Sequence, residues 1–228
     1  MSPSARDALG IVASYAFVFG FIGVATLLMK RRVMLPSATR KVIHIGVAHW
    51  WLIAMTMMDD PWVASVGPLS FIIINALDIR FRLLPAMDEV ADGRNWGTVY
   101  FPVSLLVLVN LCWRGVMPAW VGGIGVLVLG WGDGCAALVG ERSGGAGLRI
   151  WGGRKSAAGT AAMFAASFAV TLVFTLAFSH RFGALLPAAG AAAATAAVAT
   201  VVELVTPLGI DNITVPLVVA GLYVGLFV

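Results

Sequence analysis

Long apolar runs separated by short polar clusters are the main pattern of this sequence. A helix needs about 20 apolar residues to cross the roughly 30 Å hydrocarbon layer of a membrane. Runs that approach this length span residues 8–29, 42–58, 61–77, 99–113, 116–140, 157–179, 184–205 and 213–228. We therefore expect an all-α fold, a polytopic membrane bundle of about eight transmembrane helices that forms one integral membrane domain over residues 1–228. Because the second, third and fourth runs are short, a count of seven to nine spans also fits the pattern.

The composition supports this class. Of the 228 residues, 60% are hydrophobic and 11% are charged, and the mean hydropathy is +0.95. Soluble domains carry about 25% charged residues, so an ordinary soluble domain is excluded. The first apolar run is followed by a Lys-Arg-Arg cluster and has no small-residue cleavage site, so we expect a membrane span and not a signal peptide.

The basic residues are distributed unevenly among the predicted loops. Twelve of the fifteen Lys and Arg residues fall in loops 30–41, 78–98 and 141–156, which alternate with short loops that carry few charges. Basic residues in short loops stay on the cytoplasmic side. We therefore predict that both termini lie outside, as in the inner membrane of a bacterium, and we infer no nucleic-acid partner from the positive net charge.

Ionisable residues within a span are rare because each costs roughly 2.5–3.5 kcal/mol on insertion scales. Asp133 interrupts the fifth run in "GWGDGC", seven residues before Gly140 and about 10 Å from the predicted end of the span. A carboxylate at that depth, facing a cavity open to the cytoplasm, suits Mg²⁺, which prefers oxygen ligands. The alternative is a buried ion pair with Arg142 or Lys155.

Other polar residues gather at the same predicted face. Arg40 and Lys41 precede His44 by four and three residues, which places all three on one helical face. Glu203 closes the seventh span, and Asp211 follows a helix-breaking segment. Glu203 and Asp211 offer oxygen ligands for a metal or a nucleotide. The alternative for Arg40 and Lys41 is a role in orienting the protein in the membrane, and the alternative for His44 is a hydrogen bond to a backbone carbonyl. Asp211 or Asn212 could instead cap the last helix.

The segment between the fifth and sixth runs is rich in glycine, with five glycines before Arg154, Lys155 and Ser156. A helix that starts directly afterwards would present free N–H groups, and with a nearby lysine it would favour an anion such as phosphate. The pattern differs from a P-loop, because Arg154 stands where that motif requires glycine. A flexible linker is the alternative interpretation.

Four stretches, "RKVIH", "GDGCAALVGERSG", "GGRKSAAGT" and "ELVTPLGIDNITVPL", resemble landmarks of the family that contains dolichol kinase and phytol kinase. These are integral membrane enzymes that phosphorylate prenyl or polyprenyl alcohols, commonly with CTP. Phosphatidate cytidylyltransferases share the Asp-x-x-Ala-x-x-x-Gly core but have a different C-terminal motif. Ala158 stands where the family usually has Glu, a departure that affects one polar contact to the nucleotide.

The resemblance implies a cytoplasmic-side active site formed by residues 40–44, 130–160 and 203–212. The implied metal ligands for Mg²⁺ are Asp133, Glu203 and Asp211. The implied contacts to CTP or another nucleoside triphosphate are Arg40, Lys41, Gly140, Arg154, Lys155, Ser156, Gly159 and Asn212. The implied catalytic residues are Asp133, Lys155 and His44, with His44 as base or as the group that orients the acceptor hydroxyl.

The partners expected are a lipid alcohol, the nucleotide and the bilayer, and a homodimer is compatible with the sequence. Synthesis of a CDP-lipid and phosphorylation of diacylglycerol are the alternative activities. A transporter is disfavoured because we find no internal repeat and because the polar groups gather on one face. The choice among phytol, geranylgeraniol, farnesol, longer polyprenols and diacylglycerol stays open, as does the choice between CTP and ATP.

Overall fold

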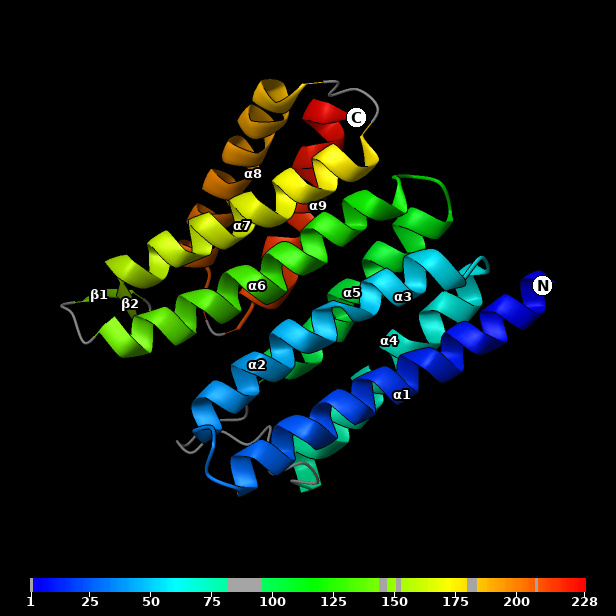
Figure 1. The fold of residues 1–228 in the computed structure, drawn as a ribbon, viewed down its shortest axis with the longest axis horizontal. Coiled ribbons are helices and arrows are strands. Elements are labelled where there is room, and N and C mark those ends of the chain that lie inside the picture. Colours follow the sequence, from blue (N-terminus) through cyan, green and yellow to red (C-terminus); the bar gives the residue numbers. More distant parts are fainter. Residues whose placement is uncertain (1, 82–95, 144–146, 151–152, 180–183, 208) are drawn as a thin grey trace. The chain divides into compact units, whose positions relative to one another are not determined.

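The structure is a computed structural model that describes residues 2–81, 96–143, 147–150, 153–179, 184–207 and 209–228. These residues cluster into two compact units, Met1–Val116 and Met117–Val228. The first unit contains α1 (Pro3–Lys30), α2 (Pro36–Ala48), α3 (Trp50–Met57), α4 (Pro61–Phe81) and α5 (Gly97–Trp113). The second contains α6 (Ala119–Ser143), β1 (Gly147–Ile150), β2 (Gly153–Ser156), α7 (Ala157–Phe178), α8 (Leu185–Val205) and α9 (Asp211–Phe227) (Figure 1).

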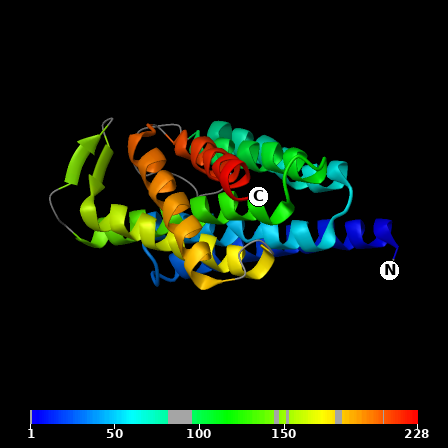
Figure 2. The ribbon, with the colours of Figure 1, turned by 90° about the horizontal axis from the view of Figure 1, so that it is seen from above.

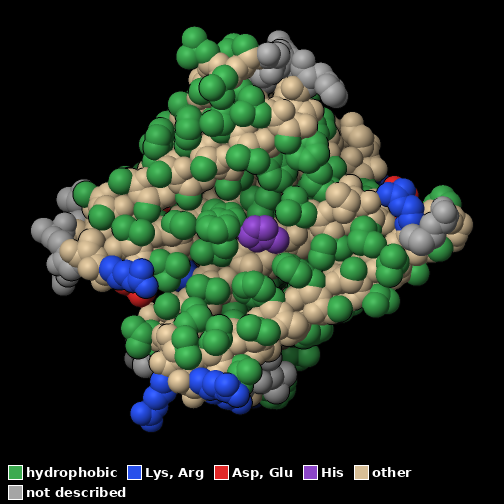
Figure 3. Space-filling model, viewed as in Figure 1, with side chains coloured by type: hydrophobic (Ala, Val, Ile, Leu, Met, Phe, Trp, Pro, Cys, Tyr) green, Lys and Arg blue, Asp and Glu red, His purple; other side chains and the backbone are tan. Residues whose placement is uncertain are grey.

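Every predicted apolar run falls on helix, so the helical class is confirmed. Five helices among the described residues, α1, α4, α6, α7 and α8, are long and apolar enough to cross a membrane, whereas α5 and α9 are shorter apolar helices. Hydrophobic side chains cover much of the face shown in Figure 3, as expected for helices that contact lipid. The count of eight spans and the placement of the termini stay predictions.

The second predicted run forms two helices because the chain turns at His49. The backbone N–H of His49 donates to the Gly46 carbonyl, 3.0 Å away, in a tighter turn than the α-helical pattern. The imidazole Nδ1 of His49 donates to the Ile45 carbonyl at 2.9 Å. The side chain therefore supplies a partner to the carbonyl that the regular backbone ladder would have used, which keeps the break satisfied within an apolar segment.

Within the first unit, α1 runs antiparallel to α2 and α3. The Phe21 ring fills the space beside Gly46, where an added Cβ would overlap it. Near the other end of α1, Arg6 pairs with Asp59 at 3.0 Å, and the buried Asp7 carboxylate accepts the Asp59 backbone N–H at 2.8 Å. Aromatic packing at one end and polar contacts at the other fix the register of α1.

A proline explains one of the contacts between α4 and α5. Pro102 lies inside α5 and has no N–H, so it cannot donate to the carbonyl of Thr98 four residues earlier. The side-chain amide of Asn75, from α4, donates to that carbonyl at 2.6 Å. The Thr98 carbonyl therefore accepts, in place of an N–H from position 102, a hydrogen bond that links α5 to α4.

Helix α6 lies at the centre of the second unit, and the segment 121–130 is buried throughout. Glycines allow its neighbours to approach closely. A Cβ added at Gly159 of α7 would lie 2.7 Å from the Ala136 carbonyl oxygen, and one added at Gly125 would lie 2.5 Å from the Pro216 carbonyl oxygen of α9. Both α7 and α9 thus pack against α6 backbone to backbone, and both run antiparallel to it.

A two-stranded hairpin joins α6 to α7, where the sequence predicted a glycine-rich loop. β1 and β2 pair antiparallel, with Leu148 opposite Lys155, and the hairpin projects beyond the ends of both helices (Figure 2). Helix α6 also continues to Ser143, three residues past the predicted end at 140. The described parts of this segment, 147–150 and 153–156, are therefore paired strands, whereas the choice between a phosphate-binding role and a linker role stays a prediction.

The close approach of α6 and α9 predicts a stability effect. Gly125→Val should lower the melting temperature in detergent by about 5 °C, because the new side chain must displace the α9 backbone. Gly190→Val is the control, since a Cβ at Gly190 in α8 meets nothing within 4 Å. Equal melting temperatures for the two variants, measured by differential scanning fluorimetry, would contradict the packing described here.

Candidate metal and phosphate site

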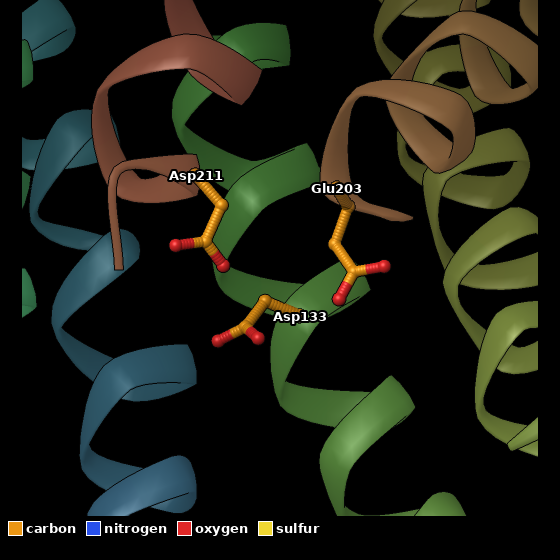
Figure 4. Close-up of side chains that lie close together, drawn as sticks. All are labelled: Asp133, Glu203 and Asp211. Atoms are coloured by element: carbon orange, nitrogen blue, oxygen red, sulfur yellow. The ribbon is translucent and has the colours of Figure 1, made fainter. Parts of the chain in front are cut away.

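Three carboxylates from separate helices come together in the second unit. Asp133 of α6, Glu203 of α8 and Asp211 of α9 each offer one oxygen atom, and these oxygens lie within 4.8 Å of one another. The three side chains lie close together and come from separate helices (Figure 4). All three residues are buried, with relative exposures of 8%, 3% and 9%. The residues that the sequence indicated as metal ligands are therefore neighbours in space.

The lengths of the helices determine how deep this cluster lies. Asp133 precedes the last residue of α6 by ten positions, which corresponds to about 15 Å along the helix axis. The sequence predicted about 10 Å because α6 was expected to end at residue 140. The extra turn comes from Glu141, Arg142 and Ser143, which are exposed and polar but remain helical.

The other two carboxylates lie at the ends of two consecutive helices, on either side of the segment that connects α8 to α9. Glu203 lies in the last turn of α8, and Asp211 is the first residue of α9. Gly209 between them has φ +79°, a conformation that favours glycine. Across this segment, the hydroxyls of Thr206 and Thr214 lie 3.2 Å apart and join the end of α8 to the first turn of α9.

Sequence reasoning missed that threonine pair. Thr206 and Thr214 flank the segment that carries Asp211. Each hydroxyl also lies within hydrogen-bond distance of the backbone carbonyl four residues earlier, and since a hydroxyl has one proton, the threonine that donates to the other threonine does not donate to its own carbonyl. Two threonines on either side of a Pro and Gly break were the available signal. Their contact limits how far α8 and α9 can separate, and it therefore supports the distance between Glu203 and Asp211.

Asn212 makes local contacts beside the cluster. Its side-chain amide donates to the Asp211 carboxylate Oδ1 at 3.3 Å and to the Gly209 carbonyl at 3.1 Å. These bonds orient the Asp211 carboxylate and stabilise the turn that precedes α9. The role of Asn212 as a nucleotide contact stays a prediction, and the structure offers a positioning role in addition.

Lys155 supplies a positive charge to the cluster. Its ammonium pairs with the Glu203 carboxylate, and the Lys155 side chain is 29% exposed whereas that of Glu203 is 3% exposed. Lys155 was one of the two basic residues expected as possible partners of Asp133, and the ion pair that it forms in the structure includes Glu203. Close carboxylates repel one another when all are ionised, so a cluster of three favours nearby positive charge, and Lys155 supplies one such charge. The oxygen donors fit Mg²⁺ or Mn²⁺.

The start of α7 places Lys155 at this position. Ser156 is the N-cap of α7, and its Oγ accepts the Gly159 backbone N–H at 3.1 Å. Gly140 of α6 lies against Ser156, since a Cβ added there would be 3.1 Å from Ser156 Oγ. These three residues form the junction of α6 and α7, and their expected contacts to a nucleotide stay predictions. Arg154 belongs to β2, and its side chain lies outside the described residues.

The remaining candidate residues belong to the first unit. Arg40, Lys41 and His44 are half-buried on α2, and the His44 ring lies 4.8 Å from the Phe101 ring, centroid to centroid, with a tilt of 58°. Arg40, Lys41 and His44 therefore all lie on α2, as their spacing requires if they are to share one helical face. Their participation in a common site with the three carboxylates stays a prediction.

Comparison with known proteins adds a functional direction. A phytol kinase from Synechocystis sp. is 36% identical over 158 residues, which cover 68% of this chain and 65% of that protein. The chain is similar to phytol kinases. A probable chloroplastic phytol kinase 2 from Glycine max is 30% identical over 163 residues, 70% of this chain and 53% of that protein. A probable chloroplastic phytol kinase from Triticum aestivum is 27% identical over 170 residues, 70% of this chain and 55% of that protein.

The similarity covers only part of each relative. The chain spans between about half and two thirds of the length of these relatives, as the shares of 53%, 55% and 65% show. No family model matches the chain. No solved structure matches it either. The comparisons support the prenol kinase part of the expected resemblance, whereas a relationship to dolichol kinases or to phosphatidate cytidylyltransferases stays an expectation.

The bonds of Asn212 predict a measurable effect on metal binding. Asn212→Ala should weaken Mn²⁺ binding to the purified protein about tenfold, because removing a group that orients a ligand typically costs that much or more. Titration followed by electron paramagnetic resonance would measure it, with Asn110→Ala as the control, since Asn110 bonds to a backbone carbonyl of α5. Unchanged Mn²⁺ affinity together with a raised nucleotide KM would assign Asn212 to the nucleotide instead.

Proposed function

We propose that the protein is a membrane kinase that transfers a phosphoryl group from a nucleoside triphosphate, CTP in the first instance, to the hydroxyl of a membrane-embedded prenyl alcohol. The observation that carries the proposal is the buried cluster of Asp133, Glu203 and Asp211 with Lys155 paired to it. Similarity to phytol kinases supports the choice of a prenol acceptor.

The three carboxylates would hold Mg²⁺. Their oxygen atoms suit that ion, and a bound cation would reduce the repulsion among three buried carboxylates. When bound, the ion neutralises charge on the phosphates and holds them in place. Asp133, on the rigid central helix, would fix the position of the site, while Glu203 and Asp211 complete the donor set from two helix ends.

Basic groups and backbone amides would bind the triphosphate. Lys155 lies directly before the N-terminus of α7, where helix geometry favours an anion. In the proposal Arg154 adds a second positive charge from the same strand, and Arg40 and Lys41 contribute from α2. Phosphoryl transfer requires positioning and charge stabilisation more than covalent chemistry, and these are the groups that supply both.

His44 would act on the acceptor. A phosphoryl-transfer transition state that is largely dissociative does not require a strong base, so orienting the hydroxyl is sufficient. An imidazole can accept a hydrogen bond from that hydroxyl and take its proton. Packing against Phe101 would hold the ring in one orientation.

The activity itself is the first test. Purified protein should transfer labelled phosphate from CTP or ATP to one or more alcohols in a panel of phytol, geranylgeraniol, farnesol, a polyprenol and diacylglycerol. Asp133→Asn should reduce turnover by about 10²-fold or more, because it removes a charge from the metal site. Asp7→Asn is the matched control, since Asp7 is equally buried at 8% exposure but bonds to the backbone of residues 59 and 60.

Three results would contradict this assignment. Near-normal turnover in Asp133→Asn would remove the metal role of that residue. An equal loss in Asp7→Asn would indicate a general effect of changing a buried carboxylate. Release of pyrophosphate with formation of a CDP-lipid, in place of a phosphorylated alcohol, would identify a cytidylyltransferase.

The proposed orientation places the nucleotide site in the cytoplasm. In a background without Cys112 and Cys135, Leu35→Cys should react with a membrane-impermeant maleimide only after the cytoplasmic face is opened, and Leu186→Cys should react from outside. Both side chains are exposed on the surface of the protein, at 71% and 84%, and both lie at or near the predicted end of a span, Leu35 in loop 30–41 and Leu186 in the first turn of α8. Reversed labelling of the pair would invert the topology and with it the cytoplasmic site.

A further inference from the structure

The Glu203 carboxylate has two possible cationic partners. It pairs with the ammonium of Lys155, and it also offers an oxygen to the cluster formed with Asp133 and Asp211. A divalent cation at that cluster and the lysine ammonium would therefore lie close together. Because like charges repel one another at short distances even at an intermediate dielectric, the two cations do not share Glu203 without cost.

The two partners differ in freedom to move. Glu203 is almost fully buried in the last turn of α8, whereas the Lys155 side chain is partly exposed. Lys155 also extends from the hairpin that projects past the ends of α6 and α7 (Figure 2). A lysine has a flexible four-carbon stem, so its ammonium can reach another anion while its backbone stays in place. Lys155 is thus the partner that can leave.

We propose that Lys155 and the divalent metal compete for Glu203, and that binding of a triphosphate removes the competition by drawing Lys155 onto its phosphates. The inference rests on the proposed function. In the free protein Lys155 reduces repulsion among the carboxylates and stabilises the cluster. With nucleotide present, Glu203 becomes available to the metal, so nucleotide and metal bind with positive coupling, and linkage requires that each strengthens the other equally.

The alternative is a structural ion pair that stays in place throughout. In that case Lys155 contributes a fixed positive charge, and its loss destabilises the cluster without exposing Glu203 to a metal. The two cases predict opposite effects on the binding of a metal alone. That difference can be measured in the absence of nucleotide and lipid.

The experiment is a titration of the full-length protein in nanodiscs with Mn²⁺, followed by electron paramagnetic resonance. Without nucleotide, Lys155→Met and Lys155→Gln should bind Mn²⁺ about tenfold more tightly than the unsubstituted protein, because a neighbouring cation is removed. Lys30→Met, an exposed lysine at the end of α1, is the control and should leave the affinity unchanged. Adding the β,γ-methylene analogue of CTP should tighten Mn²⁺ binding about tenfold in the unsubstituted protein and much less in the Lys155 variants.

A second measurement needs no variant. The reactivity of the Lys155 amine toward an acylating reagent, quantified by mass spectrometry, should increase severalfold when Mn²⁺ saturates the unsubstituted protein, because the metal displaces the ammonium from Glu203. Unchanged or weaker Mn²⁺ binding in Lys155→Met, or unchanged amine reactivity, would overturn the competition. If Asp211→Asn leaves Mn²⁺ binding unaltered, then the carboxylates hold no metal and the proposed function loses its metal site, which is a separate result.

Discussion

Three carboxylates buried within 4.8 Å of one another are the constraint on which the second unit depends. Carboxylates this close cannot all remain ionised unless positive charge is nearby, and removing one partner from a buried ion pair is strongly destabilising. Lys155 provides one charge through Glu203. Under the proposed function a divalent ion would add further positive charge, which would connect the stability of the fold to the proposed chemistry.

The central helix makes such a cluster feasible. α6 is buried along 121–130, and its glycines let α7 and α9 approach at backbone distance. Asp133 is therefore held on a helix with little freedom. Glu203 and Asp211 sit at helix ends, where the Thr206 and Thr214 hydroxyls join the two segments. Ligands carried by regular helices are positioned more accurately than ligands on loops, and here even the helix ends are tied together.

The predicted apolar runs fall on helix, although the second run forms two helices, because a membrane span requires a long apolar segment. The same rule made Asp133 and Glu203 stand out, since an ionisable residue in an apolar run is costly. The pattern of apolar runs does not predict which basic side chain forms an ion pair with which carboxylate. That depends on how far α6 extends past Gly140 and on how the hairpin presents Lys155 toward α8, and neither follows from spacing along the chain.

Other differences have local causes. The turn at His49 arises from one backbone bond and one imidazole bond, and a periodicity of apolar residues is insensitive to both. The hairpin consists of two strands of four residues in a glycine-rich segment, too short for a clear alternating pattern. The motif that implies a nucleotide contact for Asn212 gave no indication that its amide also bonds to Asp211 and Gly209. A motif defines which residue is present, whereas the fold decides what it touches.

The depth of the cluster bears on how two unlike substrates would meet there. With 25 residues, α6 is about 37 Å long, so if centred it exceeds a 30 Å hydrocarbon layer by about 4 Å at each end. Asp133, about 15 Å from the end, then lies roughly 10 Å below the hydrocarbon boundary. A prenol can bring its hydroxyl to this depth at the cost of one group's hydration, a few kcal/mol. A triphosphate cannot do so without cations along its path, which is the role that Lys155 and a metal at the carboxylates would have under the proposed function.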